Sequence, residues 1–109
     1  MINGINSREM ILEILLEIEE GEHSHVAIRN ALSKYQFLPK QDRAFITRVC
    51  EGTLEYRIQI DYIINSFSKV TVDKMKPAIR EILRSAVYQL KYMDSVPDSA
   101  VCNEAVKLA

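Results

Sequence analysis

The stretch from Lys76 to Met93 constrains the fold most, because its apolar residues recur every three or four positions. A helix advances about 100° per residue, so this spacing gathers them into one arc of about 140°. The residues of this arc, which we expect to face the core, are Ile79, Ile82, Leu83, Ala86, Val87, Leu90 and Met93. On one flank of the arc lie four cations, with two tyrosines just beyond them. These residues are Lys76, Arg80, Arg84, Lys91, Tyr88 and Tyr92. A core seam, a basic stripe and two rings on one element make this helix the first place to look for function.

The rest of the chain is also predicted to be helical, since only three Gly and three Pro interrupt its 109 residues. Asn6 and Glu9 have the spacing of a capping box that starts a first helix, and Gly21 is suited to end it. Ser24 is expected to cap a second helix. A third, at 40–56, carries Gly52 in its interior, where we expect it to permit a close approach between helices.

A fourth helical segment, at 60–67, is expected to be continuous with the third or kinked from it. Asp73 is expected to cap the long helix, with Pro77 in its first turn. A last helix starts near Asp98, and its pattern continues to Ala109 with no helix-ending residue. We therefore expect the final element to be truncated. The predicted fold is all-α, with six helices, or five of which one is kinked, packed as a bundle.

Length and composition favour one domain spanning residues 1–109. The two isolated cysteines favour a cytoplasmic protein. The start of the chain lacks the pattern of a secretory signal, and no run is apolar enough to cross a membrane. Cys50 and Cys102 are far apart, so we expect reduced, buried thiols. The net charge of −1 hides an acidic segment at 1–22 and a basic one at 23–91. Nucleic-acid binding therefore depends on the middle of the chain.

Residue patterns that would indicate a catalytic or metal-binding site are absent from the sequence. The sequence contains no Gly-rich phosphate loop, no G-x-S-x-G and no obvious nucleophile with its His and Asp. His23 and His25 adjoin no cysteine at metal-ligand spacing, so no metal site is predicted and both are expected to be loop and cap residues. We expect neither catalytic residues nor a cofactor within this chain.

Several short motifs, in their order and spacing, together resemble the NusB-type RNA-binding domain over nearly the whole chain. They are Asp42-Arg43, Glu51-Gly52-Thr53-Leu54, Ile82-Leu83-Arg84, Tyr88-Gln89-Leu90, Val96-Pro97 and Asn103-Glu104-Ala105-Val106. The resemblance implies an all-helical fold of two orthogonally packed three-helix halves, with RNA as the partner. It also implies one more helix than this chain contains.

Two kinds of protein carry such a domain. One is the NusB transcription antitermination factor, which acts on a leader RNA with a ribosomal-protein-like partner. The other is the RsmB/Sun/Fmu-type 16S rRNA (cytosine-C5)-methyltransferase, whose N-terminal domain this chain resembles more, through Gln89 and Gly52-Thr53-Leu54. The antitermination factor also begins with an Arg-rich segment, whereas here Arg8 stands alone before six Glu. The methyltransferase resemblance implies that this domain binds small-subunit rRNA. It also implies a catalytic domain in cis beyond residue 109, which would bind S-adenosylmethionine.

We predict that one set of cations touches RNA phosphates: Lys76, Arg80, Arg84 and Lys91, with Lys40, Arg43 and Arg48 as further candidates. Tyr88 or Tyr92 could stack on an unpaired base. The alternative is that Arg84 forms internal ion pairs and that both tyrosines fill gaps between helices, which we favour for the tyrosines. A different class of function also stays open. In it, an apolar surface left by the missing last helix docks onto a protein partner or a second copy.

Overall fold

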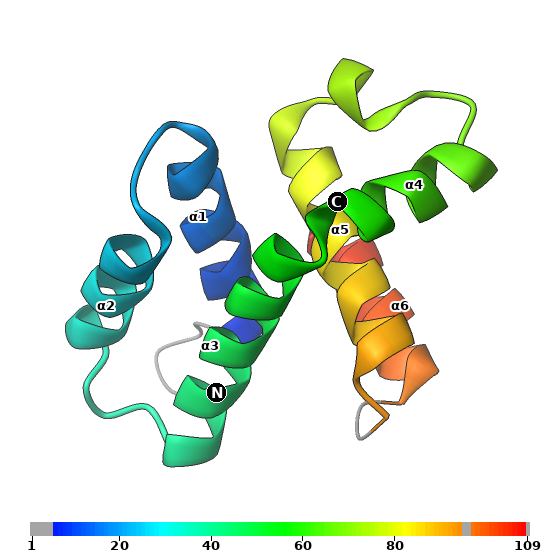
Figure 1. The fold of residues 1–109 in the computed structure, drawn as a ribbon. Helices are drawn as coiled ribbons and strands as arrows, with labels where there is room; N and C mark the ends of the chain where they lie inside the picture. The colour runs from blue at the N-terminus through cyan, green and yellow to red at the C-terminus, as the bar shows by residue number, and fades with distance from the viewer. Residues whose placement is uncertain (1–5, 95–96, 109) are drawn as a thin grey trace.

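The computed structural model describes residues 6–94 and 97–108, and helices make up most of these ranges (Figure 1). In chain order the elements are α1 (Ser7–Glu19), α2 (Ser24–Lys34), α3 (Lys40–Glu55), α4 (Arg57–Phe67), the 3₁₀ helix η2 (Val72–Lys74), α5 (Pro77–Tyr92) and α6 (Asp98–Leu108). These two ranges contain no strand, so the all-α prediction is confirmed. None of their helices combines the length and hydropathy that a bilayer span requires.

The ends of α1 follow the sequence closely. The Glu9 backbone N–H donates to Asn6 Oδ1 at 2.8 Å, and Asn6 Nδ2 donates to Glu9 Oε1 at 3.0 Å. Gly21 has a φ of +114°, a conformation that glycine adopts without strain, and it ends the first helical segment. Both boundaries were predicted because each depends only on neighbours in the sequence.

Two predicted caps are wrong. Ser24 is the first residue of α2, and the cap position before it is occupied by His23, which makes no side-chain capping bond. Asp73 lies in η2, where its carboxylate accepts a hydrogen bond from the Thr71 hydroxyl, and Lys76 takes the cap position of α5. The short 3₁₀ helix that contains Asp73 was not anticipated, and it places the carboxylate away from the start of α5.

The helices form two groups of three that meet along α5. The first group contains α1, α2 and α3, and the second contains α4, α5 and α6 (Figure 1). Tyr56 separates α3 from α4, so the chain kinks there and passes from one group to the other. Across the junction α5 packs on both α1 and α3, which makes it the central helix of the domain.

The orientation of α5 differs from the sequence prediction. Ile82 and Met93 are buried as expected, but Ile79 and Leu90 are exposed, and the other apolar residues of the arc are half-buried. The face turned toward α1 and α3 is instead largely polar, and its buried residues include Glu81, Arg84, Ser85, Tyr88 and Gln89. Two cations of the predicted basic flank, Arg80 and Arg84, thus lie at the junction between the helix groups, while Lys76 and Lys91 stay exposed.

Candidate nucleic-acid interface

Arg84, a member of the predicted basic stripe, lies inside the fold. Its side chain is 5% exposed, and its Nε and Nη2 donate to the two carboxylate oxygens of Asp61, both at 2.8 Å. Its Nη1 donates to Glu19 at 2.9 Å and to Glu81 at 2.8 Å. The guanidinium therefore ties α1, α4 and α5 together, as in the alternative of internal ion pairs.

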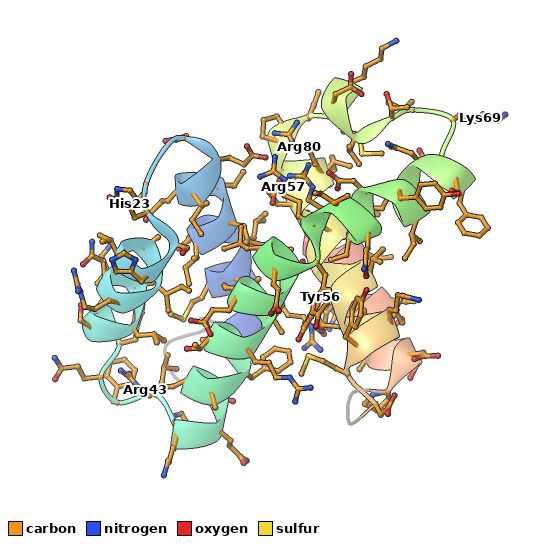
Figure 2. The ribbon with its side chains drawn as sticks, viewed as in Figure 1. His23, Arg43, Tyr56, Arg57, Lys69 and Arg80 are labelled. Atoms are coloured by element: carbon orange, nitrogen blue, oxygen red, sulfur yellow. The ribbon has the colours of Figure 1, made fainter. Side chains whose placement is uncertain are left out.

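Arg80 belongs to the same ionic cluster. Its Nη2 lies 3.2 Å from Glu19 Oε1, its Nε lies 3.3 Å from Glu81 Oε2, and its Nη1 donates to the Val72 carbonyl at 3.4 Å. Figure 2 shows Arg80 at the junction of the two helix groups. Both arginines of this part of the stripe are therefore engaged by carboxylates of the same chain.

The cluster shifts the pKa of two carboxyl groups in opposite directions. Burial raises the pKa of Glu81 above its ordinary value, against the charges of the nearby arginines. Burial alone would also raise the pKa of Glu19, but its hydrogen bond with Arg84 and the charge of Arg80 bring it below the ordinary value. The two groups therefore hold protons unequally although they share both arginines.

The exposed lysines of α5 do not form a continuous stripe. Lys76 precedes the first turn and Lys91 lies near the end, so roughly 22 Å of helix separates them. Lys91 borders an open hollow of about 440 Å³ whose other lining residues, on α4, are Ile58, Gln59, Tyr62 and Ile63. Of the predicted cations of α5, Lys76 and Lys91 are thus exposed but far apart.

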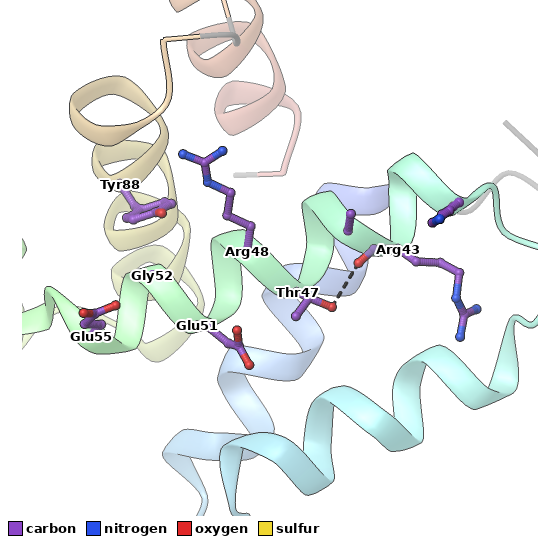
Figure 3. A pocket seen from close by; sticks show the side chains of 9 residues that line it. Arg43, Thr47, Arg48, Glu51, Gly52, Glu55 and Tyr88 are labelled. Carbon is purple, nitrogen blue, oxygen red and sulfur yellow. Dashed lines mark hydrogen bonds between the residues drawn. The ribbon is translucent and has the colours of Figure 1, made fainter.

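The predicted cations of α3 do come together. Lys40, Arg43 and Arg48 line an open groove of about 580 Å³ that runs along the outer face of α3. The other lining residues are Ala44, Thr47, Glu51, Gly52, Glu55 and Tyr88. Lys40 and Arg48 are exposed and take part in no ion pair among the described residues. Figure 3 shows Arg48 reaching toward the Tyr88 end of the groove and Arg43 toward α2.

The tyrosines of α5 pack on a third ring that was not singled out from the sequence. Tyr56, at the α3–α4 kink, stacks on Tyr92 with centroids 4.5 Å apart, and Tyr92 stacks on Tyr88 at 5.4 Å. Tyr88 is only 5% exposed, so its ring fills the junction between the two helix groups. This agrees with the alternative that the tyrosines fill gaps between helices. Tyr92 is half-buried, and Lys91 Nζ lies 5.9 Å from its ring centroid. The position of Tyr56 could have been inferred from the sequence, because Tyr56 follows Gly52 by four residues and therefore lies on the same helix face.

The two cysteines differ in their surroundings. Cys50 is buried in the core, and burial raises the pKa of its thiol to about 12. Cys102 is exposed on α6, so the expectation that both thiols are buried is wrong for that residue. A buried thiol that stays protonated is unsuited to act as a nucleophile.

A model of the NusB family matches residues 5–109. The chain is 31% identical over 94% of its length to "Probable ribosomal RNA small subunit methyltransferase B" of Bacillus subtilis, but it spans only 23% of that protein. It is also 31% identical to "Transcription antitermination protein NusB" of Acetivibrio thermocellus, of which it spans 72%. Among solved structures, the antitermination factors NusB and NusE in complex with dsRNA give a TM-score of 0.83 at 18% identity, covering 94% of this chain and 76% of the other.

Proposed function

Since the chain belongs to the NusB family, we propose that it is the RNA-binding domain of a small-subunit rRNA (cytosine-C5)-methyltransferase. The domain itself is non-catalytic and positions rRNA in the cytoplasm for a catalytic domain in cis. That catalytic domain would lie beyond residue 109 and bind S-adenosylmethionine. The similarity to two methyltransferases supports this assignment, because the chain spans about a quarter of each, the share expected of one domain in a larger enzyme.

The single structural observation that carries the RNA assignment is the groove along α3. Lys40 and Arg48 are exposed there and engaged by no carboxylate among the described residues, so both charges are available to phosphates. Contacts with the phosphate backbone supply most of the affinity of sequence-independent RNA binding. Arg80 and Arg84 do not belong to this interface, since an incoming phosphate would have to displace Glu19, Asp61 and Glu81 from them.

The first helix supports the methyltransferase assignment over the antitermination one. Glu13, Glu17 and Glu20 are exposed, so that side of the domain repels phosphate. Arg8, the single cation of α1, donates to Gln89 Oε1 at 3.0 Å and lies 5.2 Å from the Phe45 ring centroid. It therefore joins α1 to α5 and α3 and offers little to an RNA strand.

Replacing the groove cations tests the assignment. A small-subunit rRNA fragment is titrated against the domain at several salt concentrations, with wild type and the Lys40→Gln/Arg48→Gln double variant. The double variant should bind more weakly, and its salt slope should flatten by about 0.7 for each lost contact on a single strand. Lys69→Gln is the control, because Lys69 is an exposed cation of the α4–η2 loop at the opposite end of the molecule from Arg43 (Figure 2). Equal slopes for the double variant and wild type would reject the groove.

The antitermination factor is the second candidate function, favoured by the match to most of the length of the Acetivibrio thermocellus protein. The antitermination function predicts that a leader RNA, together with a ribosomal-protein-like partner, binds the domain more tightly than an rRNA fragment does. The methyltransferase assignment predicts the reverse order. Competition between the two RNAs, with and without the partner, therefore separates the two.

A protein-interaction module is the third candidate, and the exposed apolar side chains of α4 favour it. Ile58 is 87% exposed and Phe67 is 88% exposed, with Tyr62 exposed between them. Sedimentation of the domain across a range of concentrations tests this function. Dimers whose formation depends on concentration, with no shift on adding RNA, would support interaction over RNA recognition.

A further inference from the structure

A second groove lies between α2 and α3 and adjoins the first. Its volume is about 460 Å³, and its lining residues are His25, Ile28, Arg29, Leu32, Ser33, Gln36, Arg43 and Glu51. Arg43 and Glu51 line both grooves, so the two grooves adjoin at these side chains. None of the residues from α2 and the turn after it was predicted from the sequence to bind anything, although Arg29 and Ser33 lie one helical turn apart on α2 and Gln36 follows in the next turn of the chain.

The two sides of this second groove differ in character. Ile28 and Leu32 supply an apolar wall, and both are at least half-buried. The exposed side chains of Arg29, Ser33 and Gln36 line the same groove and offer a charge and several hydrogen-bonding groups. A nucleotide needs the same combination, because its base is flat and largely apolar on its faces while its edge and phosphate are polar.

Arg43 stands where the two grooves meet, and its guanidinium is fixed in place. Its Nη1 donates to the Leu32 carbonyl at 3.1 Å and to the Tyr35 carbonyl at 3.0 Å, both near the end of α2. Within the described ranges its Nε and Nη2 make no hydrogen bond, so these donors are free to bind an anion. Since the side chain is already ordered, binding a phosphate costs less entropy than it would for a mobile lysine.

We infer that a single strand of RNA continues from the α3 groove into the α2–α3 groove and places an unpaired nucleotide there. This inference rests on the proposed RNA-binding function and extends its site. The free donors of Arg43 bind the phosphate at the junction, the base lies against Ile28 and Leu32, and Arg29 binds the next phosphate. Two arginines, Arg29 and Arg43, and one carboxylate, Glu51, line this second groove. Its net positive charge therefore favours binding of the RNA phosphate backbone.

The test compares RNA of two lengths and two forms. Arg29→Gln should weaken binding of an unpaired strand of about eight nucleotides by about threefold, because one partly exposed contact is lost. It should leave binding of a strand of about four nucleotides unchanged, since that length occupies the α3 groove alone. Duplex RNA should also bind unchanged, because a paired base does not enter the groove. Lys34→Gln is the matched control, an exposed cation of the same helix that lines neither groove.

Arg43→Lys provides a second, independent variant. Lysine keeps the positive charge but lacks the planar set of donors of a guanidinium, so the strand of about eight nucleotides should bind more weakly. Thermal unfolding checks that the variant is folded. Equal effects of Arg29→Gln and Lys34→Gln, or equal losses for unpaired and duplex RNA, would overturn the inference. If Arg48→Gln lowers affinity but Arg29→Gln does not, the α2–α3 site alone fails. If neither variant lowers affinity, the proposed function fails with it.

Discussion

Gly52 of α3 packs directly against the ring of Tyr88 of α5, and a Cβ atom built at Gly52 would overlap that ring. The absence of a side chain at one position therefore makes room for an aromatic side chain on another helix. Because Tyr88 stacks in turn with Tyr56 and Tyr92, this contact sets how closely the two groups of helices approach. The prediction that Gly52 serves a close approach of helices is confirmed.

Gly52→Ala should therefore destabilise the domain by about 1–3 kcal/mol, although alanine is the better helix former by about 1 kcal/mol. Urea unfolding measures the free energy of unfolding. Combining Gly52→Ala with Tyr88→Leu should cost less than the sum of the two single changes, because the smaller side chain removes the overlap. A stabilised Gly52→Ala variant would show that the two helices have room to separate.

Arg84→Met should cost about 3–5 kcal/mol of stability, because it leaves the carboxylates of Asp61 and Glu81 without their main partner in a buried setting. Chemical denaturation is again the measurement. Lys76→Gln, an exposed change on the same helix, should alter stability by less than about 0.5 kcal/mol. Equal stabilities for the two variants would mean that the ionic cluster contributes nothing to the fold.

The pH dependence of stability should reveal that the pKa values of Glu81 and Glu19 are shifted in opposite directions. Glu81 has a raised pKa in the folded state, so the folded protein holds its proton more tightly than the unfolded chain does. Its contribution to stability is consequently lost as pH rises from 4.5, the ordinary value, through the raised pKa. Unfolding free energies measured from pH 4 to pH 7 should fall less steeply in Glu81→Gln than in wild type across that window.

Glu19 should behave in the opposite way. Its pKa is lowered in the folded state, so its contribution is present above 4.5 and is lost as pH falls through the lowered pKa. Glu19→Gln should remove part of the acid destabilisation below pH 4.5, and Glu81→Gln should not. If both variants shift the same limb of the profile, the two carboxyl groups are not distinguished as the structure indicates.

The thiols offer a test of the core that is independent of the ionic cluster. A thiol reagent at neutral pH should modify Cys102, which is exposed, and leave Cys50, which is buried and whose pKa is about 12. Unfolding should make both thiols reactive. Cys102→Ser should abolish the reaction of the native protein. Rapid modification of that variant would mean that the core around Cys50 opens readily.

The sequence alone determined that the fold is all-α and where several of its helix ends lie. Asn6, Gly21 and Pro77 mark boundaries through contacts with residues no more than four positions away, so their effect can be inferred without a tertiary structure. The caps assigned to Ser24 and Asp73 failed because Ser24 lies one residue after the true cap position, His23, and Asp73 lies before the true cap, Lys76, displacements that periodicity does not resolve.

Only the tertiary structure decided which face of α5 is buried and which cations face solvent. Glu19 and Asp61 lie 65 and 23 residues from Arg84 in the sequence, and their pairing makes a charged side chain favourable at the junction of two helix groups. A periodicity that counts apolar residues places such a side chain outside, because it contains no information about partners on other helices. The positions of the helices are thus set by local sequence, and the groups left free for a ligand are set by long-range pairing.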